Sequence, residues 1–182
     1  MEIEAIIDWF EKNRNEFSEE MNGYKDIPVN SYLSTLPLIN RDGKIIDLGC
    51  GNGMLLRFLM EFSGHSLIPH GIDIKKEAID VLISRIIPEY NGNFSVCDVN
   101  EYDFPGGPYD LIIGNPAYTG TKGLEFTNRC IDNLNPGGKL ILRMHNDIIR
   151  RYDEGKIKPH YRDLNLDISE GANIRFCTYD KK

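Results

Sequence analysis

A glycine-rich loop at residues 47–53 is the segment most suited to chemistry, with the sequence Asp-Leu-Gly-Cys-Gly-Asn-Gly. Glycine lets a backbone turn tightly while a ligand lies against it, and the helix expected after the loop offers free N–H groups to an anion. Met54 stands where a dinucleotide-binding fingerprint needs glycine, and the sequence lacks the Gly-Lys-Ser/Thr ending of a P-loop. The spacing D-x-G-x-G-x-G therefore predicts a different ligand site and disfavours a NAD-dependent oxidoreductase.

Two further acids follow apolar runs. Asp73 lies in Gly71-Ile72-Asp73-Ile74, and Asp98 follows Cys97. A carboxylate at either place could accept hydrogen bonds from a ligand, and each such bond contributes about 1.5–3 kcal/mol. The alternatives are a surface acid for Asp73 and a turn or helix-capping residue for Asp98. Because Asp73 lies roughly 20 residues beyond the loop, ligand binding is the favoured interpretation.

These groups must be positioned by alternating strands and helices, which the sequence predicts in order. Strands are expected over residues 44–48, 67–72, 94–97, 109–113 and 139–144, and helices over residues 2–20, 31–38, 53–63, 75–87, 121–134 and 146–153. The alternation predicts a parallel sheet with helices on both faces. Residues 164–168 and 174–179 should form an antiparallel hairpin, because the short link 169–173 cannot make a parallel crossover. The segment 98–108, rich in proline and glycine, has little room for a helix.

Composition limits the remaining possibilities. The 182 residues carry a net charge of −7, and no apolar run approaches the length of a membrane span. The N-terminus is acidic and lacks the features of a secretory signal, which predicts a cytoplasmic protein. The cysteines form no C-x-x-C pair and the histidines are scattered, so we expect neither a disulfide framework nor a metal site. The four cysteines, expected to be free buried thiols, are Cys50, Cys97, Cys130 and Cys177.

The motifs resemble those of class I S-adenosylmethionine-dependent methyltransferases. The resemblance runs in order from about residue 44 to residue 179, and its motifs lie at residues 47–53, 71–74, 97–99, 109–116 and 134–140. It implies an α/β, three-layer Rossmann-like methyltransferase fold, with a seven-stranded, mostly parallel sheet and an antiparallel C-terminal hairpin. It also implies one methyltransferase domain over residues 1–182, with residues 1–40 as a helical cap and residues 44–179 as the cofactor-binding core.

The resemblance implies S-adenosylmethionine as the cofactor, S-adenosylhomocysteine as its product, and no metal. Asp47 would orient the loop and the cofactor's ammonium group, although it could instead only hold loop amides. Asp73 would bind the ribose hydroxyls. Asp98 would accept from the adenine amino group, with the Val99 amide facing a ring nitrogen. The expected cofactor-binding residues are Asp47, Gly49, Cys50, Gly51, Asn52, Gly53, Asp73, Ile74, Asp98, Val99 and Asn115.

The segment Asn115-Pro116-Ala117-Tyr118 resembles the family's N-P-P-Y motif, which is associated with methyl transfer to a planar nitrogen. The Asn115 carboxamide oxygen and the Pro116 carbonyl would accept hydrogens from that nitrogen and localise its lone pair. Tyr118 would stack on a flat substrate, an interaction worth about 1–3 kcal/mol per base. Asn115, Pro116 and Tyr118 are thus the expected catalytic residues. Ala117 replaces the second proline of the motif, and a plain strand-end turn is the alternative.

Together these features predict a methyltransferase that acts on a planar nitrogen of a protein side chain, an RNA or a nucleobase. A small-molecule methyltransferase and a non-catalytic cofactor-binding subunit of a larger complex are the alternatives. Residues 1–138 carry a net charge of −10, which argues against wrapping naked nucleic acid by counterion release, although residues 150–162 offer a local basic rim. No target-recognition domain of the kind attached to sequence-specific DNA enzymes is expected in the sequence, so sequence-specific binding of duplex DNA is not expected either. Tyr24, Tyr32 and His145 could contact the acceptor, or could simply pack in the core.

Overall fold

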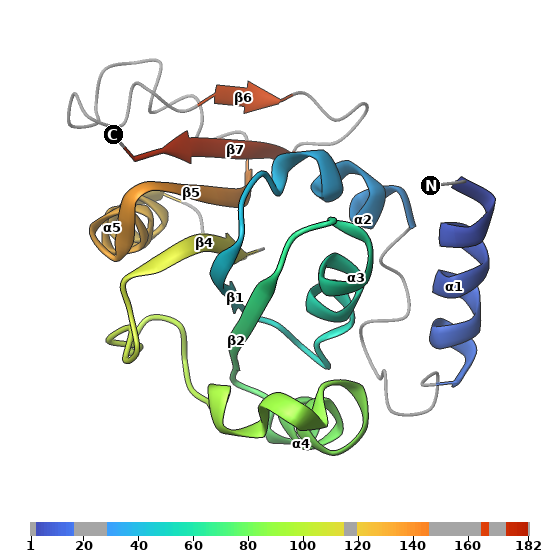
Figure 1. Cartoon of the computed structure of the whole chain (residues 1–182). Coiled ribbons are helices and arrows are strands. Elements are labelled where there is room, and N and C mark those ends of the chain that lie inside the picture. The colour runs from blue at the N-terminus through green and yellow to red at the C-terminus, as the bar shows by residue number, and fades with distance from the viewer. Residues whose placement is uncertain (1–2, 17–28, 115–119, 146–164, 168–173, 182) are drawn as a thin grey trace.

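The computed structural model describes residues 3–16, 29–114, 120–145, 165–167 and 174–181 (Figure 1). Within these residues seven strands form one sheet in the order β3-β2-β1-β4-β5-β7-β6. The first five strands in this order are parallel to one another, whereas β7 is antiparallel to both β5 and β6. The strands are β1 (Gly43–Leu48), β2 (Leu67–Asp73), β3 (Phe94–Val96), β4 (Tyr109–Gly114), β5 (Leu134–His145), β6 (Asn165–Asp167) and β7 (Ile174–Asp180). The predicted fold class is confirmed.

Strand order reverses at the centre of the sheet, and this reversal places the candidate site. From β1 the chain moves outward through β2 to β3, then returns to form β4 on the other side of β1. Leu48 at the end of β1 pairs with Ile72 on β2 and with Gly114 on β4, so the three strands end at the same edge. In open parallel sheets, ligands bind outside the carboxyl ends of the strands at such a reversal.

The two faces of the sheet carry separate apolar clusters. Side chains alternate along a strand, so Ile45 joins one cluster and Ile46 the other. The first cluster packs against α1 (Ile3–Glu16), α2 (Val29–Thr35), α3 (Met54–Phe62) and α4 (Lys76–Val81). The second cluster takes its helical side chains from α5 (Gly120–Asp132). Figure 1 shows α5 and α3 on opposite sides of the sheet.

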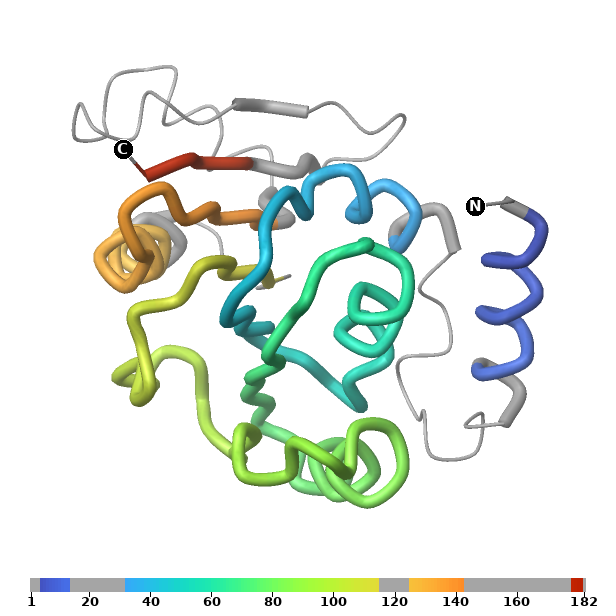
Figure 2. The backbone as a smooth tube through the Cα atoms, viewed as in Figure 1, coloured from blue at the N-terminus to red at the C-terminus, as the bar shows by residue number. Residues whose placement is uncertain are grey.

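The second face is completed by a connection without a helix. Residues 97–108 join β3 to β4, and all of them are described and non-helical, as predicted. Figure 2 traces this connection as an open loop. Its aromatic side chains Tyr102 and Phe104 are buried in the second cluster together with Tyr109, the first residue of β4. Aromatic side chains therefore cover part of the sheet where a helix could have stood.

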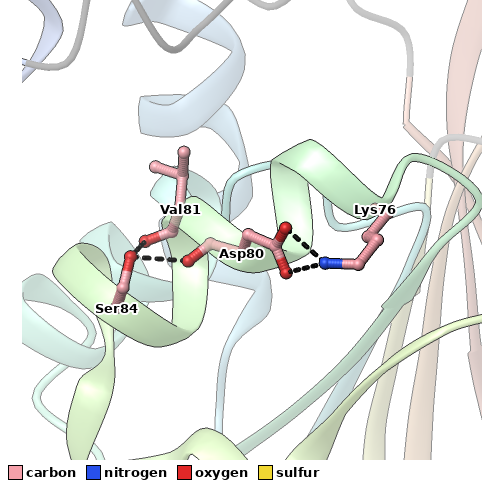
Figure 3. Close-up of polar contacts among 4 residues, drawn as sticks. All are labelled: Lys76, Asp80, Val81 and Ser84. Atoms are coloured by element: carbon pink, nitrogen blue, oxygen red, sulfur yellow. Dashed lines mark hydrogen bonds and ion pairs between the residues drawn. The ribbon is translucent and has the colours of Figure 1, made fainter.

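The helix predicted over residues 75–87 is present, but it is not α-helical throughout. α4 ends at Val81, and Leu82–Ile86 (η2) form a π-helical turn that closes with a bond from the Ile87 N–H to the Leu82 carbonyl. The Ser84 hydroxyl donates to the Asp80 carbonyl at 2.6 Å, beside an ion pair between Lys76 and Asp80 (Figure 3). Such back-bonding by serine bends helices. Two 3₁₀ segments, Leu36–Leu38 (η1) and Pro88–Asn93 (η3), complete the described elements.

The predicted start of the fifth strand is also wrong. β5 begins at Leu134, so it includes the Asn-Pro-Gly-Gly segment that suggested a turn. Pairing explains the difference: Gly137 and Gly138 exchange backbone hydrogen bonds with Lys181, and Leu134 pairs with Tyr109 across a register shift. The helix predicted over residues 146–153 lies outside the described residues. None of the helices in the described part of the chain is long and apolar enough to cross a membrane.

Candidate active site

The glycine loop leaves the end of β1, and its backbone amides bind groups on β2. The N–H groups of Gly49 and Cys50 both donate to the Ile72 carbonyl at 2.9 Å, which ties the loop to β2. The φ angles of Gly49, Gly51 and Gly53 are +87°, +55° and +79°, a region that favours glycine. A Cβ atom on Gly49 would meet no other atom within 4 Å, so open space lies beside the backbone there. There is therefore room for a ligand beside Gly49; the binding of a ligand there stays a prediction.

Asp73 joins this loop to the end of β2. One carboxylate oxygen accepts from the Gly51 N–H at 2.9 Å, and the other accepts from the Lys75 N–H at 2.8 Å. The side chain is buried, with 7% of its surface exposed. The structure thus gives Asp73 a role in shaping the loop; its predicted contact with ribose hydroxyls stays a prediction.

Asp47 lies at the same edge, near the end of β1, and is almost fully buried. Burial, and to a smaller extent the negative charge of Asp73, raise its pKa to about 7. Burial and these two acids also raise the pKa of the Cys50 thiol. A cationic ligand placed here would offset the repulsion between the two carboxylates. The pair therefore fits a ligand that carries a sulfonium or ammonium group.

Asn52 contributes a buried amide to the loop. Its Oδ1 accepts from the Met54 N–H at 3.4 Å, at the start of α3. Its Nδ2 is buried and has no hydrogen-bond partner within the described structure. Leaving such a donor unpaired costs about 1–3 kcal/mol. The loop therefore fits a ligand that brings an acceptor, such as a carboxylate.

The remaining described candidates lie at the ends of β2 and β3. The Cys97 N–H donates to the Asp73 carbonyl at 3.0 Å, which brings the start of the β3–β4 connection beside the end of β2. Asp98 Oδ1 accepts from both the backbone N–H and the side-chain amide of Asn100, each at 2.8 Å. Ile74, directly after β2, is 66% exposed, so its side chain is accessible to a ligand at this edge. Val99 is partly buried against the second apolar cluster.

The expected catalytic residues Asn115, Pro116 and Tyr118 lie outside the described residues, as does Tyr24. The side chain of His145 is likewise outside them. Tyr32 lies in the first apolar cluster, where its ring packs edge-on against Phe10 and Phe58, so core packing is its role in the structure.

Two side chains that the sequence did not single out also reach this edge. Asn100 holds Asp98, and Arg129 of α5 donates to the backbone carbonyls of Asn100 and Tyr102. No local signal marks Arg129, because it lies 31 residues beyond Asp98 on an ordinary amphipathic helix. Among the described residues, no three His, Cys, Asp or Glu side chains are grouped to hold a metal ion. Cys50, Cys97 and Cys130 are free thiols.

A family model described as a methyltransferase domain matches residues 45–138. No curated protein sequence matches the chain. Among solved structures, TrmN from Thermus thermophilus is similar with 17% identity and a TM-score of 0.63 over 83% of this chain. The chain spans only 48% of the length of TrmN.

Two other solved structures match over more of their own length. An rRNA methylase from Streptococcus thermophilus has 17% identity and a TM-score of 0.59, over 84% of this chain and 94% of that protein. A ribosomal protein L11 methylase from Lactobacillus delbrueckii subsp. bulgaricus has 14% identity and a TM-score of 0.60, over 83% and 77% respectively. At these identities the structural likeness shows a shared fold.

Proposed function

The chain belongs to the methyltransferase domain family of class I S-adenosylmethionine-dependent enzymes, and we propose that it methylates a planar nitrogen on a protein side chain, an RNA or a nucleobase. The observation that carries the cofactor part is the link from the Gly51 N–H to the Asp73 carboxylate, at the edge where strand order reverses. It places an open glycine loop beside a buried acid, which suits a ligand with hydroxyl groups and a positive charge.

We assign each part of the cofactor to residues at this edge. Asp73 would accept from the ribose hydroxyls, and Asp47 would face the ammonium group. Asp98 would accept from the adenine amino group, the Val99 amide would face a ring nitrogen, and the exposed side chain of Ile74 would contact the cofactor. When bound, the cofactor supplies an electrophilic methyl group on a sulfonium, and S-adenosylhomocysteine is the product. No metal is needed for this chemistry.

The acceptor assignment rests on the sequence that follows β4. The Asn115 carboxamide oxygen and the Pro116 carbonyl would accept the hydrogens of the planar nitrogen, and Tyr118 would stack on the substrate. A new bond would form between the nitrogen and the methyl carbon as the bond from carbon to sulfur breaks, and the nitrogen would then lose a proton. The similar rRNA methylase and ribosomal protein methylase agree with a macromolecular acceptor. A cytoplasmic location and a single domain over residues 1–182 remain predictions from the sequence.

Calorimetry tests the cofactor part. S-adenosylhomocysteine should bind the purified chain, and Asp73→Ala should weaken binding by about 1.5–3 kcal/mol. Heat with NAD and none with either cofactor form would overturn the assignment. A screen with labelled methyl donor over protein, RNA, DNA and metabolite pools identifies the acceptor. A methylated metabolite would favour the small-molecule alternative, which the net charge of −7 also favours. The absence of any product, despite cofactor binding, would favour a subunit that serves a partner.

Single-turnover rates on the identified acceptor test the planar-nitrogen chemistry. Asn115→Ala should lower kcat by ~10²–10³, because it removes a preorganised polar group, while cofactor affinity barely changes. Tyr118→Ala should weaken acceptor binding by about 1–3 kcal/mol, and Tyr118→Phe should be mild because it keeps the ring. Near-normal turnover in Asn115→Ala would mean that the Asn-Pro segment is only a turn.

A further inference from the structure

The β3–β4 connection contributes a residue to the candidate cofactor site although it contains no helix. It carries Asp98, the residue assigned to the adenine, and it runs from residue 97 to residue 108 with no regular structure of its own. A loop of this kind has few internal backbone bonds to fix its shape. Those within it are the bond from Glu101 N–H to the Asp98 carbonyl and the bond from Gly107 N–H to the Phe104 carbonyl. Its conformation must therefore be set by contacts from elsewhere.

Arg129, near the end of α5, supplies three such contacts. Its Nη1 donates to the Asn100 carbonyl at 2.6 Å, and its Nη2 donates to the Tyr102 carbonyl. Its guanidinium also lies over the Phe104 ring, 5.8 Å from the ring centre. A planar guanidinium can make two parallel bonds and stack on a ring at once, which a lysine cannot do. One side chain thus holds three positions of the loop.

The contact with Asn100 leads directly to the candidate ligand-binding group. Asn100 donates from its backbone N–H and from its side-chain amide to the same oxygen of Asp98, Oδ1, at 2.8 Å each. A chain of hydrogen bonds therefore runs from α5 through Asn100 to the Asp98 carboxylate. By occupying one oxygen, Asn100 fixes the direction of the other.

The backbone of Phe104 gives independent support. Its φ angle is +54°, which bulky residues rarely adopt and which persists only where surrounding contacts hold it. Its ring is buried, and Arg129 lies over it. The loop is therefore held in a conformation that it would not prefer alone.

We propose that Arg129 is a positioning residue for cofactor binding, acting through Asn100 on the carboxylate of Asp98. This inference rests on the proposed function, because it takes Asp98 as the group that meets the adenine. Arg129 lies on α5, so a residue outside the ligand-contacting loops would help to determine how the site binds the cofactor. It also makes the packing of α5 against the loop a determinant of cofactor affinity.

The test measures S-adenosylhomocysteine affinity by calorimetry in a double-mutant cycle of Arg129→Gln and Asp98→Ala. Arg129→Gln should weaken binding about tenfold in the wild-type background and have little effect when Asp98 is already alanine. Lys181→Gln is the matched control, because Lys181 also donates to backbone carbonyls beside α5, at Ile131, Asp132 and Leu134. It should lower the melting temperature and leave affinity within about twofold.

The outcomes separate this inference from the proposed function. No binding by the wild-type chain would overturn both. Weaker binding in Asp98→Ala with normal binding in Arg129→Gln would overturn the positioning role alone. So would an equal effect of Arg129→Gln in both backgrounds. An unchanged affinity in Asp98→Ala would overturn both the positioning role and the assignment of Asp98 to the adenine. If Arg129→Gln does not fold, Asn100→Ala replaces it in the same cycle, because Asn100 is exposed. Loss of the hydrogen bond from the Asn100 side-chain amide to Asp98 should weaken S-adenosylhomocysteine binding by a few-fold, again only when Asp98 is present.

Discussion

The two halves of the candidate cofactor site are built in different ways. At the glycine loop the backbone makes the site: amides of the loop donate to the Ile72 carbonyl and to Asp73. At the β3–β4 connection side chains make it: Arg129 holds two loop carbonyls, and the Tyr109 hydroxyl donates to the Pro105 carbonyl at 2.8 Å. The first half is continuous with the parallel core of the sheet, whereas the second is a loop attached to a helix.

This difference predicts which substitutions should disturb each half of the site. A backbone-built loop depends on glycine conformations and on the space beside them, so a single added methyl group can disturb it. A loop held by side chains loses one contact at a time, and water can replace part of what is lost when the groups are near the surface. We expect substitutions in the first half to affect folding strongly, and those in the second half to change cofactor affinity more than stability.

The largest effect should come from Gly53→Ala in the glycine loop. Gly53 has a φ of +79°, and a Cβ atom there would lie 2.7 Å from the fully buried side chain of Leu82. Backbone strain and overpacking together should lower the free energy of unfolding by about 2–5 kcal/mol. Gly64→Ala is the control, because Gly64 has a φ of +73° but open space beside it. Urea unfolding should show a loss of only about 1–2 kcal/mol there; equal losses would mean that packing against Leu82 is unimportant.

The next effect concerns the buried acid in the same half. The pKa of Asp47 is about 7 in the folded chain against an ordinary value of 3.8. Between these values the folded state holds a proton that the unfolded state has lost, so stability falls as pH rises from about 4 to 7. Asparagine at position 47 cannot titrate, so Asp47→Asn should remove this contribution to the pH dependence of the free energy of unfolding.

At pH 8 the Asp47→Asn chain should be more stable than wild type, on the order of 2–4 kcal/mol. At pH 4 the difference should nearly vanish. The measurement is urea unfolding of both chains without ligand, at several pH values from 4 to 8. Parallel stability curves for the two proteins would show that Asp47 is ionised in the fold throughout this range.

The same contrast explains what could be predicted from the sequence. β1, β2 and β4 were predicted to within one residue at each end. β1 and β4 contain the short apolar runs typical of buried parallel strands, which need no distant information, whereas the run in β2 is interrupted by Pro69, His70 and Gly71. The position of the glycine loop was predicted because its own glycines mark it, although the groups that bind its amides, the Ile72 carbonyl and the Asp73 carboxylate, belong to β2. Asp73 was correctly placed at the carboxyl edge, although its bond to the Gly51 N–H was not foreseen.

Two of the features that the sequence did not predict, the start of β5 and the role of Arg129, depend on partners far away in the sequence, and the third is local. The Asn-Pro-Gly-Gly segment resembles a turn locally, yet Lys181 pairs with it and extends β5. The π-helical turn after α4 keeps apolar spacing close to that of an ordinary helix, so the spacing does not distinguish them. Arg129 has no marker at all, since its role exists only once α5 packs beside the β3–β4 connection. The acceptor residues after Gly114 remain predictions.

The smallest effect should come from Tyr109→Phe in the side-chain-built half. Tyr109 is fully buried, but its hydroxyl donates to the carbonyl of Pro105, an exposed residue that water can reach. Phenylalanine keeps the ring and its packing, so the free energy of unfolding should fall by only about 0.5–1.5 kcal/mol. The affinity for S-adenosylhomocysteine should fall two- to fivefold, roughly, because the loop that carries Asp98 loses one of its supports. A loss of stability above about 3 kcal/mol with unchanged affinity would reverse the contrast, since that size is typical of a core defect. The second half would then be as much a part of the folding core as the first, and its helix-free connection would be as rigid as the glycine loop.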